Sequence, residues 1–366
     1  MRKKEMINYK NNLINITNSI LKHYNTKIHH PTLPLLDDIL KRNYKHVIVM
    51  LLDGLGVNIL NKLDEKSILR RHLKAELSTV FPPTTVAATN AFLIGKTPYE
   101  TGFLGWSQYN KFEDVTDEIF TKHNFYTGEK IKNNLYDLLL APDFLKQIQD
   151  NNPNLHTEMI FPEPINNSSY KTFDSMLERL LEINEGKDSL CYCYYTEPDS
   201  TMHVNGINSE KTLTILNELN FKITNFARKL NDDTLLIIVA DHGMTDIEYI
   251  YLEDYDEILE TFERPPSIES RAQTFFIKEG EKEKFIKSFN KYFQPGFIIY
   301  TKEEAYNKNI FGFGQKHPLV DSFLGDYIVI STSNKAIGYK KTEEDFKAHH
   351  AGYTKEELTI PLIIIG

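Results

Sequence analysis

The segment Lys45-His46-Val-Ile-Val-Met-Leu-Leu52 is a continuous apolar run, and Asp53-Gly54 follows it directly. A run without polar alternation indicates a strand that is buried on both faces, as in a parallel sheet covered by helices. In such sheets ligands bind at the carboxyl ends of the strands, so Asp53 is a candidate site residue. An Asp-Gly turn is also common without any function, and a repeat of the pattern is needed to distinguish the two interpretations.

A second apolar run, Ser189–Tyr195, leads into Asp199 and His203. These two residues are four apart, which places them on one face of a helical turn, and this spacing suits a single metal ion. The same run contains the two cysteines of the chain, Cys191 and Cys193. Because two cysteines imply no disulfide framework, we expect reduced thiols that are packed in the core.

A third apolar run, at 234–240, leads into Asp241 and His242. Adjacent side chains of a strand point to opposite faces of the sheet, so both residues can bind one ion only where the chain has left the strand. Gly243 permits such a turn. Three expected strand ends therefore carry an aspartate, and two of them also carry a histidine.

The segment Phe81-Pro-Pro-Thr84-Thr85 precedes a small, apolar run at 86–94 that ends at Gly95. Since prolines are excluded from helix interiors, the run predicts a buried helix with Thr84 and Thr85 at its N-terminus and Gly95 as its C-cap. The free N–H groups and the positive dipole end of a helix N-terminus favour an anion such as a phosphate. The alternative is that a threonine here only caps the helix.

Six acidic and imidazole side chains lie next to the expected strand ends. They are Asp53, Asp199, His203, Asp241, His242 and His350, the last in a glycine-containing loop before a final apolar run at 358–365. Together with Thr85 they suffice to bind two divalent ions, with zinc preferred over manganese because three of them are histidines. Two such ions can polarise a phosphoryl oxygen and activate a hydroxyl, which makes Thr85 a candidate nucleophile that forms a phosphothreonine intermediate.

Residues 265–328 differ in pattern from the rest of the chain and predict a small α+β insertion, or cap, within an α/β domain formed by 1–264 and 329–366. In this insertion we expect strands at 272–278, 296–300 and 326–330, and helices at 281–293 and 303–307. The other predicted helices lie at about 6–25, 35–42, 129–150, 171–185 and 210–230.

The composition is that of an ordinary globular protein: 366 residues, of which 41% are hydrophobic and 25% are charged. A formal net charge of −9 argues against binding of duplex nucleic acid through bulk charge. No stretch approaches the ~18 apolar residues of a membrane span, and the N-terminal Met1-Arg-Lys-Lys lacks the apolar segment of a secretory signal. We therefore expect a cytoplasmic protein without a membrane partner; the sequence does not indicate its oligomeric state.

In their order along the chain, these motifs resemble those of the alkaline phosphatase superfamily, and most of all its nucleotide pyrophosphatase/phosphodiesterase branch. The motifs are Asp53-Gly, Phe-Pro-Pro-Thr84-Thr85, Glu197-Pro-Asp199-x-x-x-His203, Asp241-His242-Gly-Met and His350-Ala-Gly352. The resemblance covers roughly residues 45 to 366. It implies an alkaline-phosphatase-like α/β fold, in which helices flank both faces of a central sheet.

The resemblance also implies a role for each matching residue. One metal ion would be held by Asp53, Thr85, Asp241 and His242, and the other by Asp199, His203 and His350. Counted back from Gly95, the nucleophile of the family falls on Thr85, which leaves Thr84 as a cap or as a hydrogen-bond donor to the site. His350, rather than His349, keeps the spacing to the glycine that follows.

Two positions depart from the pattern of the nucleotide-cleaving members. Those members place an aromatic residue directly after the nucleophile, where this chain has Val86, and an asparagine on a phosphate oxygen, where it has Trp106. Tyr194 does match an aromatic residue that lines the nucleotide pocket. The expected substrate is thus a small phosphoester, with a nucleotide left open, and Trp106 either stacks on the leaving group or packs in the core.

The function predicted from the sequence is that of a two-metal phosphodiesterase or nucleotide pyrophosphatase acting through Thr85. A phosphomonoesterase or phosphotransferase of the same superfamily is the alternative within catalysis, and it would need an additional cationic clamp. The alternative from another class is a non-catalytic, metal-stabilised binding protein that retains the fold. The natural substrate, the physiological metal and the role of 265–328 are not specified by the sequence.

Overall fold

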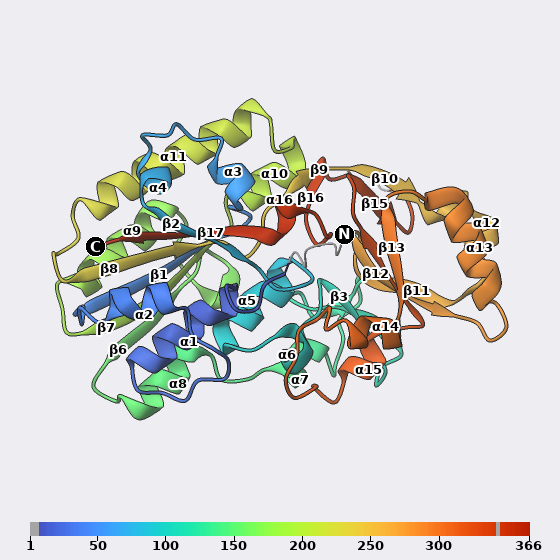
Figure 1. The fold of residues 1–366 in the computed structure, drawn as a ribbon, viewed down its shortest axis with the longest axis horizontal. Helices are drawn as coiled ribbons and strands as arrows, with labels where there is room; N and C mark the ends of the chain where they lie inside the picture. The colour runs from blue at the N-terminus through green and yellow to red at the C-terminus, as the bar shows by residue number, and fades with distance from the viewer. Residues whose placement is uncertain (1–6, 342–344) are drawn as a thin grey trace.

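Two large sheets, which lie one after the other along the long axis of the molecule, organise the chain (Figure 1). The computed structural model describes residues 7–341 and 345–366, so residue 6, the first of the helix predicted at about 6–25, lies outside the described part. The first sheet has the order β2 (Leu73–Ser78), β17 (Thr359–Ile365), β8 (Thr234–Val239), β1 (His46–Leu52), β7 (Ser189–Tyr195) and β6 (His156–Ile160).

The centre of the first sheet is parallel, as the continuous apolar runs predict. β1 pairs in parallel with both β7 and β8, and all seven of its residues are buried. The register places Leu52 opposite Tyr195 and Leu51 opposite Val239. The three strands therefore end at one edge of the sheet, and the residues that follow them are brought together. The last strand, β17, runs antiparallel to β8.

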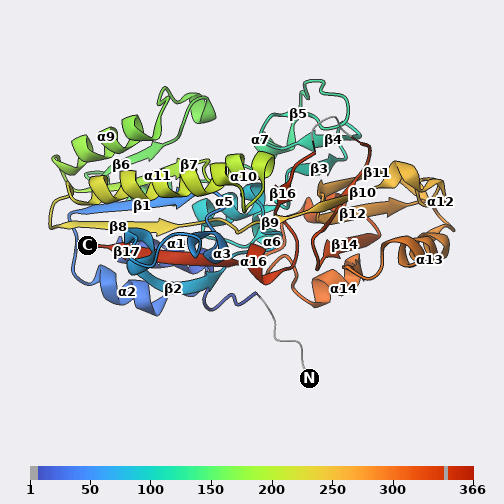
Figure 2. The same cartoon turned by 90° about the horizontal axis from the view of Figure 1, so that it is seen from above.

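Helices cover both faces of the first sheet, which confirms the predicted α/β architecture (Figures 1 and 2). One face carries α1 (Leu13–His23), α2 (Pro34–Leu40), α5 (Thr85–Ile94) and α8 (Phe144–Asn151), and the other carries α9 (Phe173–Asn184) and α11 (Glu210–Ala227). The single helix predicted near 129–150 is wrong. The chain forms α7 (Leu135–Leu139) and α8 instead, because Pro142 between them cannot continue a helix.

The second sheet is antiparallel and combines distant parts of the chain. Its order is β13 (Phe297–Thr301), β14 (Tyr327–Ser331), β12 (Ala272–Ile277), β11 (Phe262–Glu269), β3 (Ser107–Asn110), β4 (Val115–Glu118) and β5 (His123–Asn124). The strands predicted at 272–278, 296–300 and 326–330 are all present. One face is covered by α13 (Lys282–Phe293), whose Phe285 and Phe289 pack on Phe275 of β12.

Short elements complete the fold. They are the helices α3 (Val57–Leu60), α4 (Ile68–Arg71), α6 (Pro98–Thr101), α10 (Asp199–Asn205), α12 (Asp256–Leu259), α14 (Lys302–Asn307), α15 (Val320–Phe323) and α16 (Lys355–Leu358), the 3₁₀ turns Ile165–Asn167 and Leu252–Asp254, and the strand pairs β9 (Thr245–Asp246) with β16 (Ala348–His349) and β10 (Glu248–Tyr251) with β15 (Lys335–Gly338). Within the described residues, none of the helices combines the length and the apolar character that crossing a bilayer requires.

Candidate metal centre

The loops after three neighbouring strands are hydrogen-bonded to one another. Asp53 follows β1, Asp241 follows β8, and Asp199 begins α10 beyond the end of β7. The N–H of Asp199 donates to the carbonyl oxygen of Asp53 over 3.1 Å, and the N–H of Gly54 donates to Oδ1 of Asp241 over 3.1 Å. The three carboxylates predicted at the strand ends therefore meet in one place.

A first group of side chains surrounds Nε2 of His242. This atom lies 3.4 Å from Oδ1 of Asp53, 3.4 Å from Oδ2 of Asp241 and 3.2 Å from Oγ1 of Thr85. On the other side of the ring, Nδ1 is 3.0 Å from the carbonyl oxygen of Gly243 and must donate to it. Nε2 is therefore the ring nitrogen that is available as a metal ligand, and it faces the carboxylates.

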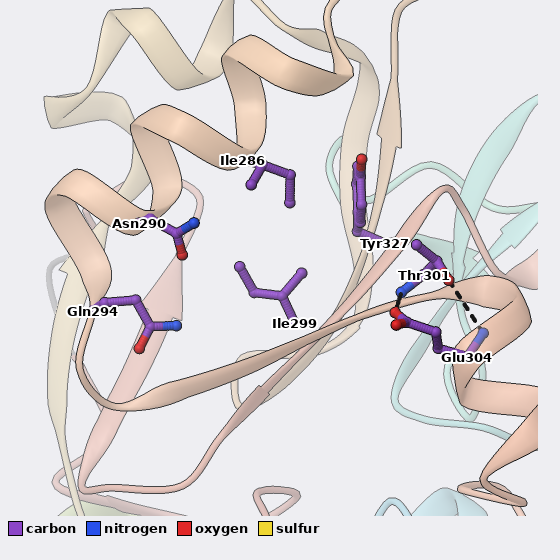
Figure 3. Close-up of a pocket in the computed structure, with 7 residues that line it drawn as sticks. All are labelled: Ile286, Asn290, Gln294, Ile299, Thr301, Glu304 and Tyr327. Carbon is purple, nitrogen blue, oxygen red and sulfur yellow. Dashed lines mark hydrogen bonds between the residues drawn. The ribbon is translucent and has the colours of Figure 1, made fainter.

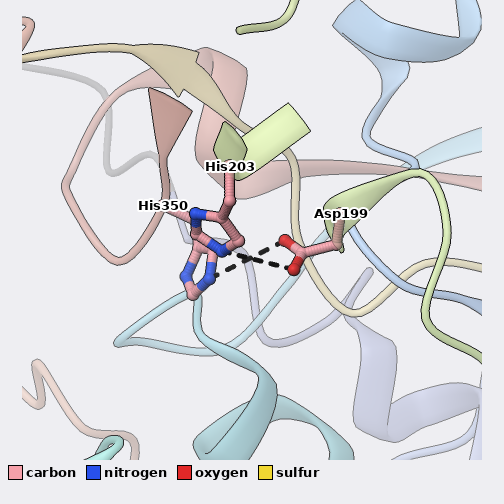
Figure 4. Close-up of side chains that lie close together, drawn as sticks. All are labelled: Asp199, His203 and His350. Carbon is pink, nitrogen blue, oxygen red and sulfur yellow. Dashed lines mark ion pairs between the residues drawn. The ribbon is translucent and has the colours of Figure 1, made fainter. Parts of the chain in front are cut away.

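A second group adjoins the first and is drawn in Figure 4. Nε2 of His203 is 3.2 Å from Oδ2 of Asp199, and Nε2 of His350 is 3.8 Å from Oδ1 of the same carboxylate. His203 donates from Nδ1 to the carbonyl oxygen of Ala348 over 2.9 Å, which leaves its Nε2 free to bind a metal. The His350 ring also stacks on the His242 ring, with ring centroids 3.8 Å apart, so the two groups of side chains are in direct contact.

The donor atoms of this cluster fit divalent cations. One ligand atom from each of Asp199, His203 and His350 lies within 4.8 Å of the others, and the same holds for Asp53, Asp199 and His242. Three buried carboxylate oxygens, Oδ1 of Asp53, Oδ1 of Asp199 and Oδ2 of Asp241, have no hydrogen-bond partner among the described residues. Burying unpaired carboxylate oxygens is costly, and oxygen and imidazole donors in this arrangement are the ligands of zinc and similar ions.

The pKa shifts at the site reflect its excess of buried negative charge. Burial, followed by the charges of Asp241 and Asp199, raises the pKa of Asp53 well above its ordinary value. Burial also raises the pKa of Asp241. Burial acts in the same direction on Asp199, but His203 and His242 outweigh it and lower the pKa of that carboxyl. A cation placed between these groups would stabilise all three in their ionised form.

The predicted helix α5 begins at Thr85 and ends at Ile94, and its C-cap Gly95 has a φ of 78°, the left-handed conformation expected there. Thr84 occupies the N-cap position, but its side chain makes no capping hydrogen bond, so of the two roles expected of it only that of a hydrogen-bond donor is present. Its hydroxyl instead donates to Oε1 of Glu269 over 2.5 Å. Thr84 is thus a donor beside the site, while Thr85 is the threonine whose hydroxyl faces His242.

Glu269, the last residue of β11, is a neighbour of the site that sequence reasoning did not find. Its Oε1 also accepts the N–H of Trp106 over 2.8 Å. Burial raises the pKa of Glu269 to about 7, against the hydrogen bonds from Thr84 and Trp106, which lower it. No apolar run marks β11, because Pro265 and Pro266 interrupt it. No sequence pattern therefore indicated that a carboxyl group would lie close to the start of α5.

The two aromatic residues predicted at the substrate differ in exposure. Tyr194 is buried, and its hydroxyl donates to Oδ2 of Asp53. Trp106 is 36% exposed, so it is not a core residue; its indole N–H donates to Glu118 and its ring packs edge-to-face on Phe120. Val86, directly after Thr85, is fully buried and leaves no side chain there for stacking.

A separate cavity of about 360 Å³ lies between α13 and the strands β13 and β14 (Figure 3). Ile286 and Asn290 of α13, Ile299 of β13 and Tyr327 of β14 are among its lining residues. None of the residues that line it belongs to the aspartate and histidine cluster. The cavity therefore contributes nothing to the metal centre.

Comparison with known proteins places these observations in context. The family described as type I phosphodiesterase/nucleotide pyrophosphatase matches residues 47–354. Among solved structures, the murine ectonucleotide pyrophosphatase/phosphodiesterase 5 aligns with a TM-score of 0.66 at 16% identity, over 87% of both chains. The human counterpart aligns with a TM-score of 0.66 at 15% identity, also over 87% of both chains.

An inactive threonine-to-alanine variant of the murine protein, solved in complex with AMP, aligns with a TM-score of 0.65 at 16% identity, again over 87% of both chains. A search of the curated proteins found no match. At these identities the solved structures establish a shared fold, and the family match extends over most of the chain.

Proposed function

Since this chain belongs to the type I phosphodiesterase/nucleotide pyrophosphatase family, whose members are hydrolases of the alkaline phosphatase superfamily, we propose that it hydrolyses phosphodiester or phosphoanhydride bonds with two divalent metal ions and Thr85 as the nucleophile. The observation that carries the proposal is the position of Oγ1 of Thr85. It lies at the N-terminus of α5, 3.2 Å from Nε2 of His242 and 3.4 Å from Oδ2 of Asp53.

We propose that Asp53, Thr85, Asp241 and His242 hold one ion and that Asp199, His203 and His350 hold the other. The family uses divalent metals, and three histidines favour zinc, with manganese as the alternative. Bound there, the ions would polarise a phosphoryl oxygen and lower the pKa of an adjacent hydroxyl.

The residues of the chain would then carry the reaction in two displacements. Oγ1 of Thr85 attacks phosphorus and loses its proton to solvent, the bond to the leaving-group oxygen breaks, and a phosphothreonine results. A water molecule next attacks phosphorus and loses a proton to solvent, the bond to Oγ1 breaks, and Oγ1 takes up a proton from solvent, which restores Thr85. The free N–H groups of the first turn of α5 favour the anionic phosphoryl group throughout.

A nucleotide is the substrate class that we propose to test first. The murine relative was solved with AMP, and this supports a nucleotide here by analogy. Trp106 offers an exposed ring, and its backbone N–H donates to the same Glu269 oxygen as the hydroxyl of Thr84, so we propose that it contacts the leaving group. Tyr194, which hydrogen-bonds to Asp53, would border the same site.

We further propose that the insertion at 265–328 borders the substrate, because Glu269 within it contacts Thr84 at the start of α5. The division into this insertion and a catalytic domain of 1–264 and 329–366 is also a proposal. A cytoplasmic location is proposed as well, supported by Cys191 and Cys193, which are buried and free.

The test is the turnover of bis(p-nitrophenyl) phosphate by Thr85→Ala and by Thr84→Ala. We expect the first variant to lose turnover by about 10³-fold or more, since no other hydroxyl replaces the nucleophile, and the second to retain most of it. Full turnover by Thr85→Ala would rule out the mechanism. Two bound metals without turnover of any phosphoester would instead support the non-catalytic binding protein.

The monoesterase alternative is tested with the same enzyme. Arg271, whose charge acts on His349 beside the site, is engaged by Glu357 and by two carbonyl oxygens and is not available as a clamp for a dianionic phosphate. We therefore expect kcat/KM for bis(p-nitrophenyl) phosphate to exceed that for p-nitrophenyl phosphate by about tenfold or more, an energy difference of about 1.4 kcal/mol. The reverse preference would favour the monoesterase.

A further inference from the structure

Arg271 is a buried arginine in the turn between β11 and β12, outside the metal-binding loops. It is 1% exposed, and its partner Glu357 is fully buried. Nε and Nη2 of the guanidinium bind the two carboxylate oxygens of Glu357 over 2.7 and 2.9 Å. Nη1 and Nη2 also donate to the carbonyl oxygens of Lys335 and Ser333, each over 2.8 Å. Thr354 also donates to Oε2 of Glu357, from its hydroxyl over 2.8 Å and from its N–H over 3.3 Å, so the guanidinium and this cap together hold the carboxylate in one orientation.

Glu357 in turn joins the two loops that carry proposed metal ligands. Its carboxylate oxygen Oε1 accepts the N–H of Gly352, two residues after His350, over 2.7 Å. Its main-chain carbonyl oxygen accepts the N–H of Gly243, the residue after His242, over 2.9 Å. One glutamate is thus hydrogen-bonded to both loops, and it links them to the second sheet through Arg271.

The fit around this pair is too close for any side chain larger than hydrogen. A Cβ atom on Gly352 would lie 2.7 Å from Nη2 of Arg271 and 2.7 Å from Oε2 of Glu357. Between His350 and Gly352, Ala351 has a φ of 83°, a conformation that residues with a Cβ adopt rarely and only where their surroundings impose it. The loop that presents His350 is therefore held by its contacts rather than by its own preference.

We propose that Arg271 is a positioning residue for the metal centre: by orienting Glu357, it sets the positions of the loops that present His242 and His350. The inference rests on the proposed function, because it concerns the ions that those histidines would bind. Residues that hold metal ligands in place typically change metal affinity 10- to 100-fold when they are replaced. A purely structural ion pair would change stability without that effect.

The first test is the affinity of the full-length protein for Zn²⁺, measured by competition with a chromogenic chelator. Arg271→Lys keeps the positive charge but cannot form the two parallel hydrogen bonds to Glu357. We expect its dissociation constant for Zn²⁺ to rise by about 10- to 100-fold. A folded Arg271→Lys protein with the affinity of the unmodified chain would overturn the proposal.

The matched control is Arg179→Lys. Arg179 forms a similar two-point pair with Glu158 over 2.9 and 2.8 Å, but it joins α9 to the edge strand β6 and not to a metal-binding loop. We expect its Zn²⁺ affinity to stay within about twofold of that of the unmodified chain. If Arg271→Lys fails to fold, Glu357→Gln is the second variant, with the same expectation. If neither Arg271→Lys nor Glu357→Gln folds, the ion pair is required for the fold as a whole, and this result would count against a role specific to the metal centre.

The second test needs no metal. In the metal-free protein, we expect backbone amide exchange in the peptides that contain Gly243 and Gly352 to become about tenfold faster in Arg271→Lys and to stay unchanged in Arg179→Lys. Unchanged exchange at both glycines would overturn the proposal. An unmodified chain that binds neither Zn²⁺ nor Mn²⁺ would contradict the proposed function, while the exchange result would still decide the role of Arg271.

Discussion

Oγ1 of Thr85 lies 3.2 Å from Nε2 of His242, although 157 residues separate the two in the chain. The hydroxyl is placed by the start of α5, and the imidazole is placed by the loop after β8. Because Nδ1 of His242 is engaged by the carbonyl oxygen of Gly243, Nε2 is the ring nitrogen that faces Thr85. The alcohol and the nitrogen that we propose as a metal ligand therefore point at one common position.

Replacement of His242 tests that position. We expect His242→Gln to lower the metal content, measured by inductively coupled plasma mass spectrometry, from two ions to one per chain, and to reduce diester turnover by at least about 10²-fold. The control is His156→Gln, on the edge strand β6 and partly exposed, which should change neither quantity. Retention of two ions by a folded His242→Gln protein would remove this residue from the ligand set.

We expect the Asp53 carboxylate to destabilise the metal-free protein and to stabilise the protein with bound metal. Since burial and the nearby Asp241 raise its pKa, the ionised form is unfavourable in the folded state, and stability is lost as pH rises through that pKa. At pH 8 without metal, Asp53→Asn should therefore be more stable than the unmodified chain by about 1–3 kcal/mol.

With Zn²⁺ at a free concentration 100 times its dissociation constant, the unmodified chain should gain about 2.7 kcal/mol, and Asp53→Asn should gain clearly less. Urea unfolding with a chelator and with Zn²⁺ measures both differences. The stability advantage of Asp53→Asn should therefore shrink or reverse on addition of metal. If Asp53→Asn is the less stable protein under both conditions, the carboxylate has a structural role instead.

The titration of Glu269 predicts a pH dependence of the free energy of unfolding that can be measured separately from the contributions of other groups. Burial raises its pKa from 4.5 to about 7 in the folded protein, so the folded state binds more protons than the unfolded state between these values. Its contribution to stability is thus fully present below about pH 4.5 and is lost as pH rises to about 7. Glu269→Gln keeps the acceptor for Thr84 and Trp106 but removes the titration.

The free energy of unfolding of Glu269→Gln, relative to that of the unmodified chain, should therefore rise by about 3 kcal/mol between about pH 4 and pH 8. Urea unfolding of the metal-free proteins at several pH values measures this difference, in which the other titrating groups cancel. A difference that does not change with pH would show that the carboxyl group titrates normally.

The centre of the fold and the metal cluster were predictable for one reason: strands buried on both faces have continuous apolar sequences, and the residues just after them meet at one sheet edge. β1, β7 and β8 were recognised in this way, and with them Asp53, Asp199 and Asp241. His203 was predicted from its four-residue spacing to Asp199. His242 was predicted because it follows the end of β8, where Gly243 lets the chain turn. The parallel register of β1 with β7 and β8 places the ends of these strands at one edge of the sheet.

Of the second sheet, the predicted strands β12, β13 and β14 are present, but the remaining strands and their contacts were not predictable by the same reasoning. β3, β4 and β5 are short and polar, with sequences SQYN, VTDE and HN, so no apolar run marks them. Glu269 follows Ile268, whose φ of 85° is rare for a β-branched residue and is imposed by tertiary contacts. The pairing of Arg271 with Glu357 spans 86 residues and has no local signature.

Gly243 offers the sharpest steric test of how the two ligand loops are held. A Cβ atom at this position would lie 2.0 Å from the carbonyl oxygen of Glu356, a backbone atom that cannot rotate away. Gly243→Ala must therefore push the loop that carries His242 away from α16. We expect a loss of about 2–4 kcal/mol in the free energy of unfolding, together with weaker binding of the ion that His242 would hold.

The control for this prediction is Gly186→Ala, at the end of α9, where an added Cβ would meet the carbonyl oxygen of Ile183 at 3.2 Å and nothing closer. It should cost less than about 1 kcal/mol and leave Zn²⁺ affinity unchanged. Thermal and urea unfolding, joined to the chelator competition, measure both quantities for the two variants. Equal effects of the two substitutions on Zn²⁺ binding would mean that the approach of Gly243 to Glu356 does not control the position of His242.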